Sequence, residues 1–153
     1  MDALVLLEAL KRREKISKLK GEDLDGLYTY YAFNPACFIN DLMFTFDPRL
    51  KGTKVVPFLL FDRQREYIDF LMTLYEDRED GLLEKCRDVG ASWLNAGFTV
   101  WLFIFRQDSA ILWGANKVNL VDVLGDMSSL MERIDFILRT LPTNFRPNYT
   151  RNY

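Results

Sequence analysis

The sequence predicts an α/β fold, in which a parallel sheet with flanking helices follows a small helical N-terminal region. Three observations support this prediction. Residues 2–20 have the apolar spacing of an amphipathic helix, and two short apolar runs, 81–86 and 109–115, have the length and composition of strands. Residues 91–106, between the two runs, have a helical pattern. Strand, glycine turn, helix and strand form a βαβ unit, which implies a parallel sheet.

The chain divides into two predicted regions. Residues 1–50 are expected to form the helical N-terminal cap, in which aromatic segments follow the first helix and serve as core or interface. Residues 51–153 are expected to form the sheet-containing region. The elements expected there besides the βαβ unit are a buried extended segment at 55–61, helices at 62–76, 119–126 and 128–141, and a loop from residue 142 onward.

Composition excludes several classes of function. The chain has 153 residues, of which 20 are basic and 22 acidic, so bulk positive charge cannot bind nucleic acid. It has no histidine, which excludes histidine-based catalysis and the common zinc sites. Cys37 and Cys86 are far apart, which favours a reducing cytoplasm over a disulfide framework. The apolar run 93–106 is shorter than the roughly 20 residues of a membrane span, so no membrane association is expected.

The stretch EKCRDVGASW, residues 84–93, has the form of a phosphate-binding loop. Gly90 allows a phosphate to approach the backbone at the start of a helix, and Ser92 provides a hydroxyl for Mg²⁺. The standard pattern GxxxxGK[ST] would place Lys85 at its first glycine and Ala91 at its lysine. The sequence therefore predicts a partial P-loop NTPase whose lysine has moved to the start of the loop.

The relocated charge can still reach a phosphate. Lys85 has a long flexible side chain that can fold back over the loop, and Arg87 provides a second, forked cation. The alternative interpretation is an ordinary turn between strand and helix, in which Lys85 and Arg87 are simply solvated.

Four blocks of the chain, in this order, resemble the large terminase subunits of tailed bacteriophages, the ATPases that pump DNA into empty capsids. The blocks are FINDLMFTFDPR, VPFLLFDRQREYIDFL, EKCRDVGASWL and ILWGANKVNLVDVLGDMSSLMERIDFILRTLP. Together they cover most of the chain. That family commonly has a variant Walker A loop that begins with a lysine and lacks the usual one.

The resemblance implies a site for ATP and Mg²⁺. It makes Arg87 the candidate catalytic residue, because dispersed positive charge stabilises the transferred phosphoryl group. It assigns Ser92 to the metal and Gln64 to the adenine edge, with Phe61 or Phe58 beside the ring; without the resemblance, Gln64 would be solvated and the phenylalanines part of the core. The residues assigned to ATP are Phe61, Gln64, Lys85, Cys86, Arg87, Asp88, Val89, Gly90, Ala91 and Ser92.

The resemblance also implies what the chain lacks. No apolar strand ending in Asp-Glu follows residue 115, so the Walker B strand and the nuclease domain are expected to be absent. The parent protein would then be an ATPase and endonuclease, whereas this portion alone would not turn over ATP. If it did, Asp122 or Asp126 would be the catalytic carboxylate. Asp47–Arg49 is expected to be a structural turn. Residues 116–126 are expected to be either an element that senses nucleotide state or lies toward DNA, or a surface helix with a polar face.

The implied partners follow from the packaging motor. They are ATP, double-stranded DNA, the portal protein, the small terminase subunit and further copies in a ring oligomer. The implied location is the host cytoplasm and, transiently, the portal vertex of the procapsid. The alternative function is a non-catalytic interaction module that binds the portal, the small subunit or another protein through the helical cap.

Overall fold

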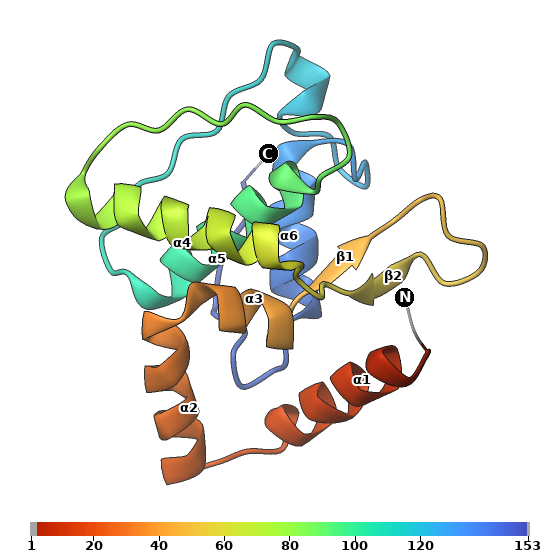
Figure 1. The fold of residues 1–153 in the computed structure, drawn as a ribbon, viewed down its shortest axis with the longest axis vertical. Coiled ribbons are helices and arrows are strands. Elements are labelled where there is room, and N and C mark those ends of the chain that lie inside the picture. Colours follow the sequence, from red (N-terminus) through yellow and green to blue (C-terminus); the bar gives the residue numbers. More distant parts are fainter. Residues whose placement is uncertain (1–2, 153) are drawn as a thin grey trace.

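The computed structural model describes residues 3–152, and its elements are mostly helices (Figure 1). Along the chain they are α1 (Ala3–Ser17), α2 (Glu22–Phe33), α3 (Pro35–Leu42), β1 (Phe44–Phe46), β2 (Val55–Pro57), α4 (Asp62–Asp77), α5 (Ala91–Phe105), the 3₁₀ helix η1 (Val118–Leu120) and α6 (Leu130–Thr140). No helix among these is long and apolar enough to cross a membrane.

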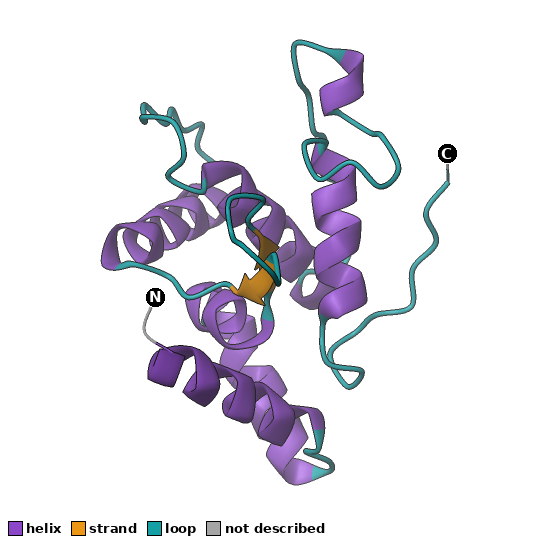
Figure 2. Ribbon diagram, turned by 90° about the vertical axis from the view of Figure 1, so that its right-hand side faces the viewer, coloured by secondary structure: helices purple, strands orange, loops and turns teal. Residues whose placement is uncertain are grey.

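The predicted fold class, a partial P-loop NTPase with a parallel sheet and flanking helices, is wrong. Helices account for 53% of the structure, and the only sheet in residues 3–152 is the antiparallel pair β1–β2. Phe44 pairs with Pro57 and Phe46 with Val55. Figure 2 shows how small this sheet is beside the helices and the long connecting segments. The extended segment predicted at 55–61 contributes β2, but β1 lies in a part of the chain expected to be helical or irregular.

The two apolar runs predicted as strands, 81–86 and 109–115, belong to no sheet. Their main-chain groups make no hydrogen bond within the described chain, and most of their residues are exposed. An apolar run becomes a strand only when another strand offers a matching ladder of donors and acceptors. In the part of the chain that the structure describes, no strand pairs with either run.

The helix predicted at 91–106 is confirmed as α5, the most buried helix of the fold. It contacts α3, α4 and α6, and its side chains Val100 and Trp101 are fully buried. Gly97 lets the backbone of α5 approach α3, because a Cβ there would lie 2.8 Å from Cε of Met43 and 3.3 Å from Cδ1 of Ile39. A helix apolar on most sides is therefore central in this structure.

The helix predicted at 2–20 is confirmed as α1, but it turns its leucines outward. Leu4, Leu7 and Leu10 are exposed, whereas Arg13 and Ile16 are buried. The guanidinium carbon of Arg13 lies 3.8 Å from the centre of the Phe44 ring, and Arg13 donates a hydrogen bond to the Thr140 carbonyl. The amphipathic spacing alone predicted the helix but not the face that packs.

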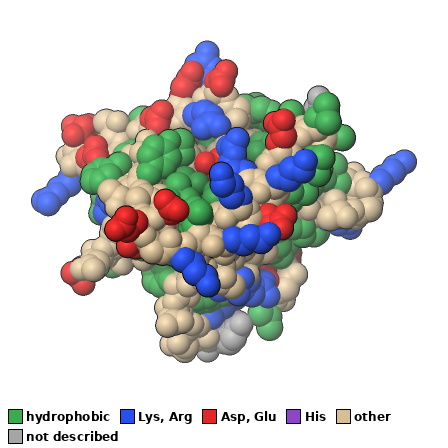
Figure 3. Space-filling view, turned by 90° about the horizontal axis from the view of Figure 1, so that it is seen from below, with side chains coloured by type: hydrophobic (Ala, Val, Ile, Leu, Met, Phe, Trp, Pro, Cys, Tyr) green, Lys and Arg blue, Asp and Glu red, His purple; other side chains and the backbone are tan. Residues whose placement is uncertain are grey.

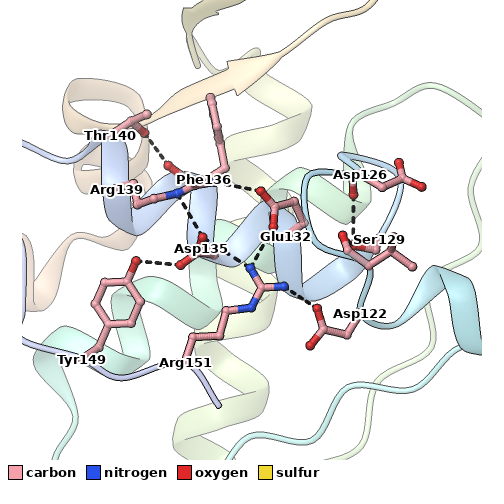
Figure 4. A network of polar contacts seen from close by, with 11 residues as sticks. Asp122, Asp126, Ser129, Glu132, Asp135, Phe136, Arg139, Thr140, Tyr149 and Arg151 are labelled. Atoms are coloured by element: carbon pink, nitrogen blue, oxygen red, sulfur yellow. Dashed lines mark hydrogen bonds and ion pairs between the residues drawn. The ribbon is translucent and has the colours of Figure 1, made fainter. Parts of the chain in front are cut away.

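The C-terminal part of the chain packs back on α6. The helix predicted at 128–141 is confirmed as α6, whereas 119–126 contains only η1 and turns instead of the predicted helix. The final described residues run past α6, and Tyr149 and Arg151 contact carboxylates on it (Figure 4). This network was not predicted.

Candidate functional site

The predicted phosphate loop is an exposed turn leading into α5. Gly90 has φ 82° and ψ 7°, a left-handed conformation that favours glycine, and α5 begins at the next residue. The N–H groups of Trp93 and Leu94 donate to the Gly90 carbonyl at 2.9 and 3.0 Å. The N–H groups of Ala91 and Ser92 have no main-chain acceptor within residues 3–152, which leaves two donors at the positive end of the helix dipole.

The structure brings Gln64 and the predicted phosphate loop together. The Gln64 side chain, in the first turn of α4, donates through Nε2 to the Val89 carbonyl at 3.0 Å. Its Oε1 accepts the main-chain N–H of Phe61 at 3.1 Å. Because an amide has two N–H bonds and two lone pairs, Gln64 keeps one of each for a ligand. A residue 25 positions earlier in the chain therefore supports the loop directly.

The phenylalanines predicted to flank a ring differ in position. Phe61 is 73% exposed at the N-cap of α4, whereas Phe58 is buried with its ring near Gly90. An exposed ring beside the loop can stack on a planar ligand, and a buried one can only shape the loop. Phe61 thus remains a candidate contact, and Phe58 belongs to the core.

The cations of the loop are exposed and unpaired. Neither Lys85 nor Arg87 forms an ion pair or a hydrogen bond within the described chain, and Cys86 is exposed beside them. Asp88 is also exposed and has φ 65°. The loop that leads into the free N–H groups of α5 thus carries two exposed cations together with the exposed carboxylate of Asp88, and cations with free helix N–H groups are the chemistry that binds an anion.

An ion pair in the connection between β1 and β2 lies near the loop, since the charge of Asp88 acts on Arg49. Asp47 accepts the Nε–H and Nη2–H groups of Arg49 at 2.9 and 3.0 Å, together with its main-chain N–H at 3.0 Å. These bonds confirm the predicted structural turn. The hydrogen bond to Asp47 is the main cause that raises the pKa of Arg49, and the negative charge of Asp88 adds to it.

The loop offers little for a metal ion by itself. Ser92 is half-buried at the start of α5, and no group of three or more His, Cys, Asp or Glu side chains in residues 3–152 could hold a cation. A Mg²⁺ bound here would therefore take most of its ligands from phosphate oxygens and water, with the Ser92 hydroxyl as the protein's contribution. The residues fit this limited role.

The two carboxylates considered for catalysis, Asp122 and Asp126, already have partners outside the loop. Asp122 pairs with Arg151, and Asp126 accepts the main-chain N–H of Ser128 at 2.8 Å. That hydrogen bond is the main cause that lowers the pKa of Asp126. Both residues form these contacts from the irregular segment that precedes α6. The 116–126 segment is thus a largely irregular surface element, and the surface-helix alternative is wrong.

Replacing Gly90 with alanine is expected to lower the free energy of unfolding by about 1–2 kcal/mol. The left-handed backbone strains any L side chain, and the added Cβ would lie 3.0 Å from Nε2 of Gln64. Urea denaturation measures the change. In Gly26→Ala, which lies inside α2 with no atom within 4 Å of the new Cβ, stability should instead rise by up to about 1 kcal/mol. Equal effects of the two changes would contradict the role given to Gly90.

A scan against models of known protein families, a search of curated proteins and a search of solved structures each found no match for this chain.

Proposed function

We propose that this chain is the ATP-binding portion of a phage terminase large subunit, the motor that couples ATP hydrolysis to packaging of viral double-stranded DNA into the procapsid. The proposal rests on the four blocks that resemble this family. One observation carries it further: the Gln64 amide touches the Val89 carbonyl, so the block with the candidate adenine contact and the block with the candidate phosphate contacts lie together.

The proposed binding follows from the loop's own groups. The triphosphate would accept hydrogen bonds from the N–H groups of Ala91 and Ser92, at the positive end of the α5 dipole. Lys85 and Arg87 would neutralise its charge from the solvent side. Mg²⁺, when bound, would neutralise charge on the β- and γ-phosphates. Gln64 would face the base with its remaining N–H and lone pair, and Phe61 would lie against the ring.

Binding without turnover is proposed for this chain on its own. Hydrolysis needs a positioned water and a carboxylate to orient it, and the candidate carboxylates Asp122 and Asp126 already bind Arg151 and the Ser128 N–H. The remaining parts of the working motor, including DNA, the portal, the small subunit and a ring of copies, are proposed for the parent protein. Its proposed location is the host cytoplasm and, transiently, the portal vertex.

Lys85→Ala is expected to weaken binding of Mg·ATP by at least about tenfold, since it removes the displaced phosphate cation; one lost charged hydrogen bond corresponds to roughly this factor. Isothermal titration calorimetry of the purified chain measures the affinity. Lys54→Ala is the matched control, because Lys54 is also an exposed loop lysine but precedes β2. Equal losses in the two variants would refute the assignment of Lys85, and steady phosphate release by the unaltered chain would refute the proposed lack of turnover.

A second candidate is a non-catalytic module that binds another protein, and α1 favours it. Leu4, Leu7 and Leu10 are exposed on this helix, next to the exposed cations Lys11 and Lys15. The face seen in Figure 3, on the side where α1 and α2 lie, carries Lys and Arg side chains beside apolar ones. If the folded chain failed to bind Mg·ATP in the titration, this second candidate would be preferred.

A further inference from the structure

Residues 107–114 form a segment with unused main-chain groups. None of their N–H or C=O groups makes a hydrogen bond within residues 3–152. The segment is nevertheless held at both ends. Asp108 adopts a left-handed turn at φ 61°, and the indole N–H of Trp113 donates to the Thr99 hydroxyl of α5 at 3.1 Å. Its row of donors and acceptors is thus presented from an anchored backbone.

The exposure of the side chains fits an extended conformation. Leu112 is 97% exposed, whereas its neighbour Ile111 is 39% exposed and its neighbour Trp113 is half-buried. Alternation with a period of two is the pattern of a strand that has one covered face. The segment belongs to no strand of the structure, so its main-chain edge is left without a partner.

A cleft lies directly beside this edge. It has a volume of about 310 Å³ and lies between α4, α5 and residues 111–114, with Leu71, Phe98 and Leu102 among its apolar lining. A second cleft of about 480 Å³ continues along residues 107–112 toward Tyr75. Asn95 and Thr99 are the polar side chains of the first cleft, and Gln107, Asp108 and Ser109 are those of the second. Among residues 3–152, Asp108 is the one charged residue that lines either cleft.

The charge of the clefts limits the class of ligand. Both clefts lack cationic side chains in their described lining, and the charged residue Asp108 is acidic, which disfavours nucleotides and nucleic acids because these need cations for their phosphates. The unused N–H and C=O groups on the rim are free to bond an extended main chain, and alternate side chains of such a chain would point at the apolar residues of the first cleft. The surface therefore suits a neutral or apolar polypeptide.

We propose that the cleft between α4, α5 and residues 107–114 binds an extended polypeptide segment, which adds as a strand along residues 109–114 and places alternate apolar side chains in the cleft. This site lies outside the predicted phosphate loop and does not depend on the proposed ATP binding. Main-chain hydrogen bonds to residues 109–114 supply affinity, and the pockets at Leu71 and Leu102 select apolar side chains.

The test uses a fluorescein-labelled nine-residue peptide in which valine alternates with threonine, capped by lysines for solubility. Fluorescence anisotropy against the purified chain gives the affinity. Two further peptides have the same side chains as the parent. One carries N-methyl groups on its odd-numbered amides and the other on its even-numbered amides, so each loses the N–H donors along one edge of the peptide strand. One N-methylated peptide is expected to bind at least tenfold more weakly than the parent, and the other within about threefold of it.

Hydrogen–deuterium exchange locates the bound peptide. The amides of residues 109–114 are expected to exchange more slowly when the parent peptide is present, while those of the β1–β2 hairpin do not change. Three results would overturn the proposal: no binding at millimolar peptide, equal binding of all three peptides, which would mean recognition by side chains alone, or protection elsewhere without protection of 109–114. A fourth result would also overturn the proposal. If the amides of 109–114 were protected in the peptide-free chain and lost this protection on dilution, a second copy of the chain, and not a foreign peptide, would occupy the edge.

Discussion

Trp101→Ala is expected to lower the free energy of unfolding by about 3–5 kcal/mol, the usual loss when a large buried aromatic side chain is removed. Trp101 is fully buried in α5, and its indole N–H donates to the Tyr31 carbonyl at 2.7 Å. Its ring lies 5.5 Å from that of Phe98 and 6.0 Å from that of Phe105, and the Arg106 guanidinium lies over it at 4.4 Å. The change would therefore remove packing, a hydrogen bond and a cation–π contact together.

Urea denaturation followed by circular dichroism measures this loss. Trp101→Phe keeps most of the ring but loses the N–H donor, and it should cost clearly less, about 1–2 kcal/mol. Trp113→Ala is the matched control, because Trp113 is only partly buried at the cleft and is expected to cost about 1 kcal/mol. A loss below about 1 kcal/mol for Trp101→Ala would show that α5 is not the central helix of the core.

Arg151→Met is expected to lower the free energy of unfolding by about 3–5 kcal/mol, because it leaves buried carboxylates with too few cations. The Glu132 side chain is 2% exposed, and its two oxygens accept from Arg151 and Arg139, each at 2.8 Å. Arg151 also pairs with Asp122 and, at 3.3 Å, with Asp135, as Figure 4 shows. Without Arg151, the more exposed Arg139 is the remaining cation for Glu132, and the Gly125 N–H is its other hydrogen-bond donor.

The matched control for Arg151→Met is Arg63→Met. Arg63 pairs with Glu66 at 2.6 Å on the surface of α4, where both side chains are mostly exposed, so the change should cost less than about 1 kcal/mol. Replacing both members of the buried pair, as in Glu132→Leu with Arg151→Met, should recover part of the loss. If Arg151→Met cost no more than Arg63→Met, the network would not stabilise the C-terminal segment.

The same network predicts a pH dependence. Burial by itself would raise the pKa of Glu132, but the hydrogen bonds from Arg151 and the Gly125 N–H and the charges of Arg139 and Arg151 outweigh it and lower the pKa below its usual 4.5. A lowered pKa in the folded state stabilises the protein above the unfolded value, and this contribution is lost as pH falls through the folded value. Unfolding free energies measured from about pH 7 down to pH 3 should decline below about pH 4.5, and less steeply in Arg151→Met. Identical profiles would remove Glu132 as the cause.

The sequence by itself determined the helices and the turn before α5. The spacing of apolar residues predicted α1, α4, α5 and α6, and the loop that ends at Gly90 was expected where it is found. A helix forms its hydrogen bonds between residues four apart, and a left-handed turn depends on the local preference of glycine. Both are properties of a short stretch of chain, so a sequence pattern is enough to locate them.

Only the tertiary structure decided which extended segments pair and which side chains are buried. Residues 81–86 and 109–115 have strand composition but no neighbouring ladder, whereas Phe44–Phe46 finds one in Val55–Pro57. The contact between Gln64 and Val89 and the burial of Glu132 against Arg151 likewise join residues 25 and 19 positions apart. A strand, a buried ion pair and a site built from two segments each depend on a partner distant in the chain, and the pattern of a single segment carries no information about that partner.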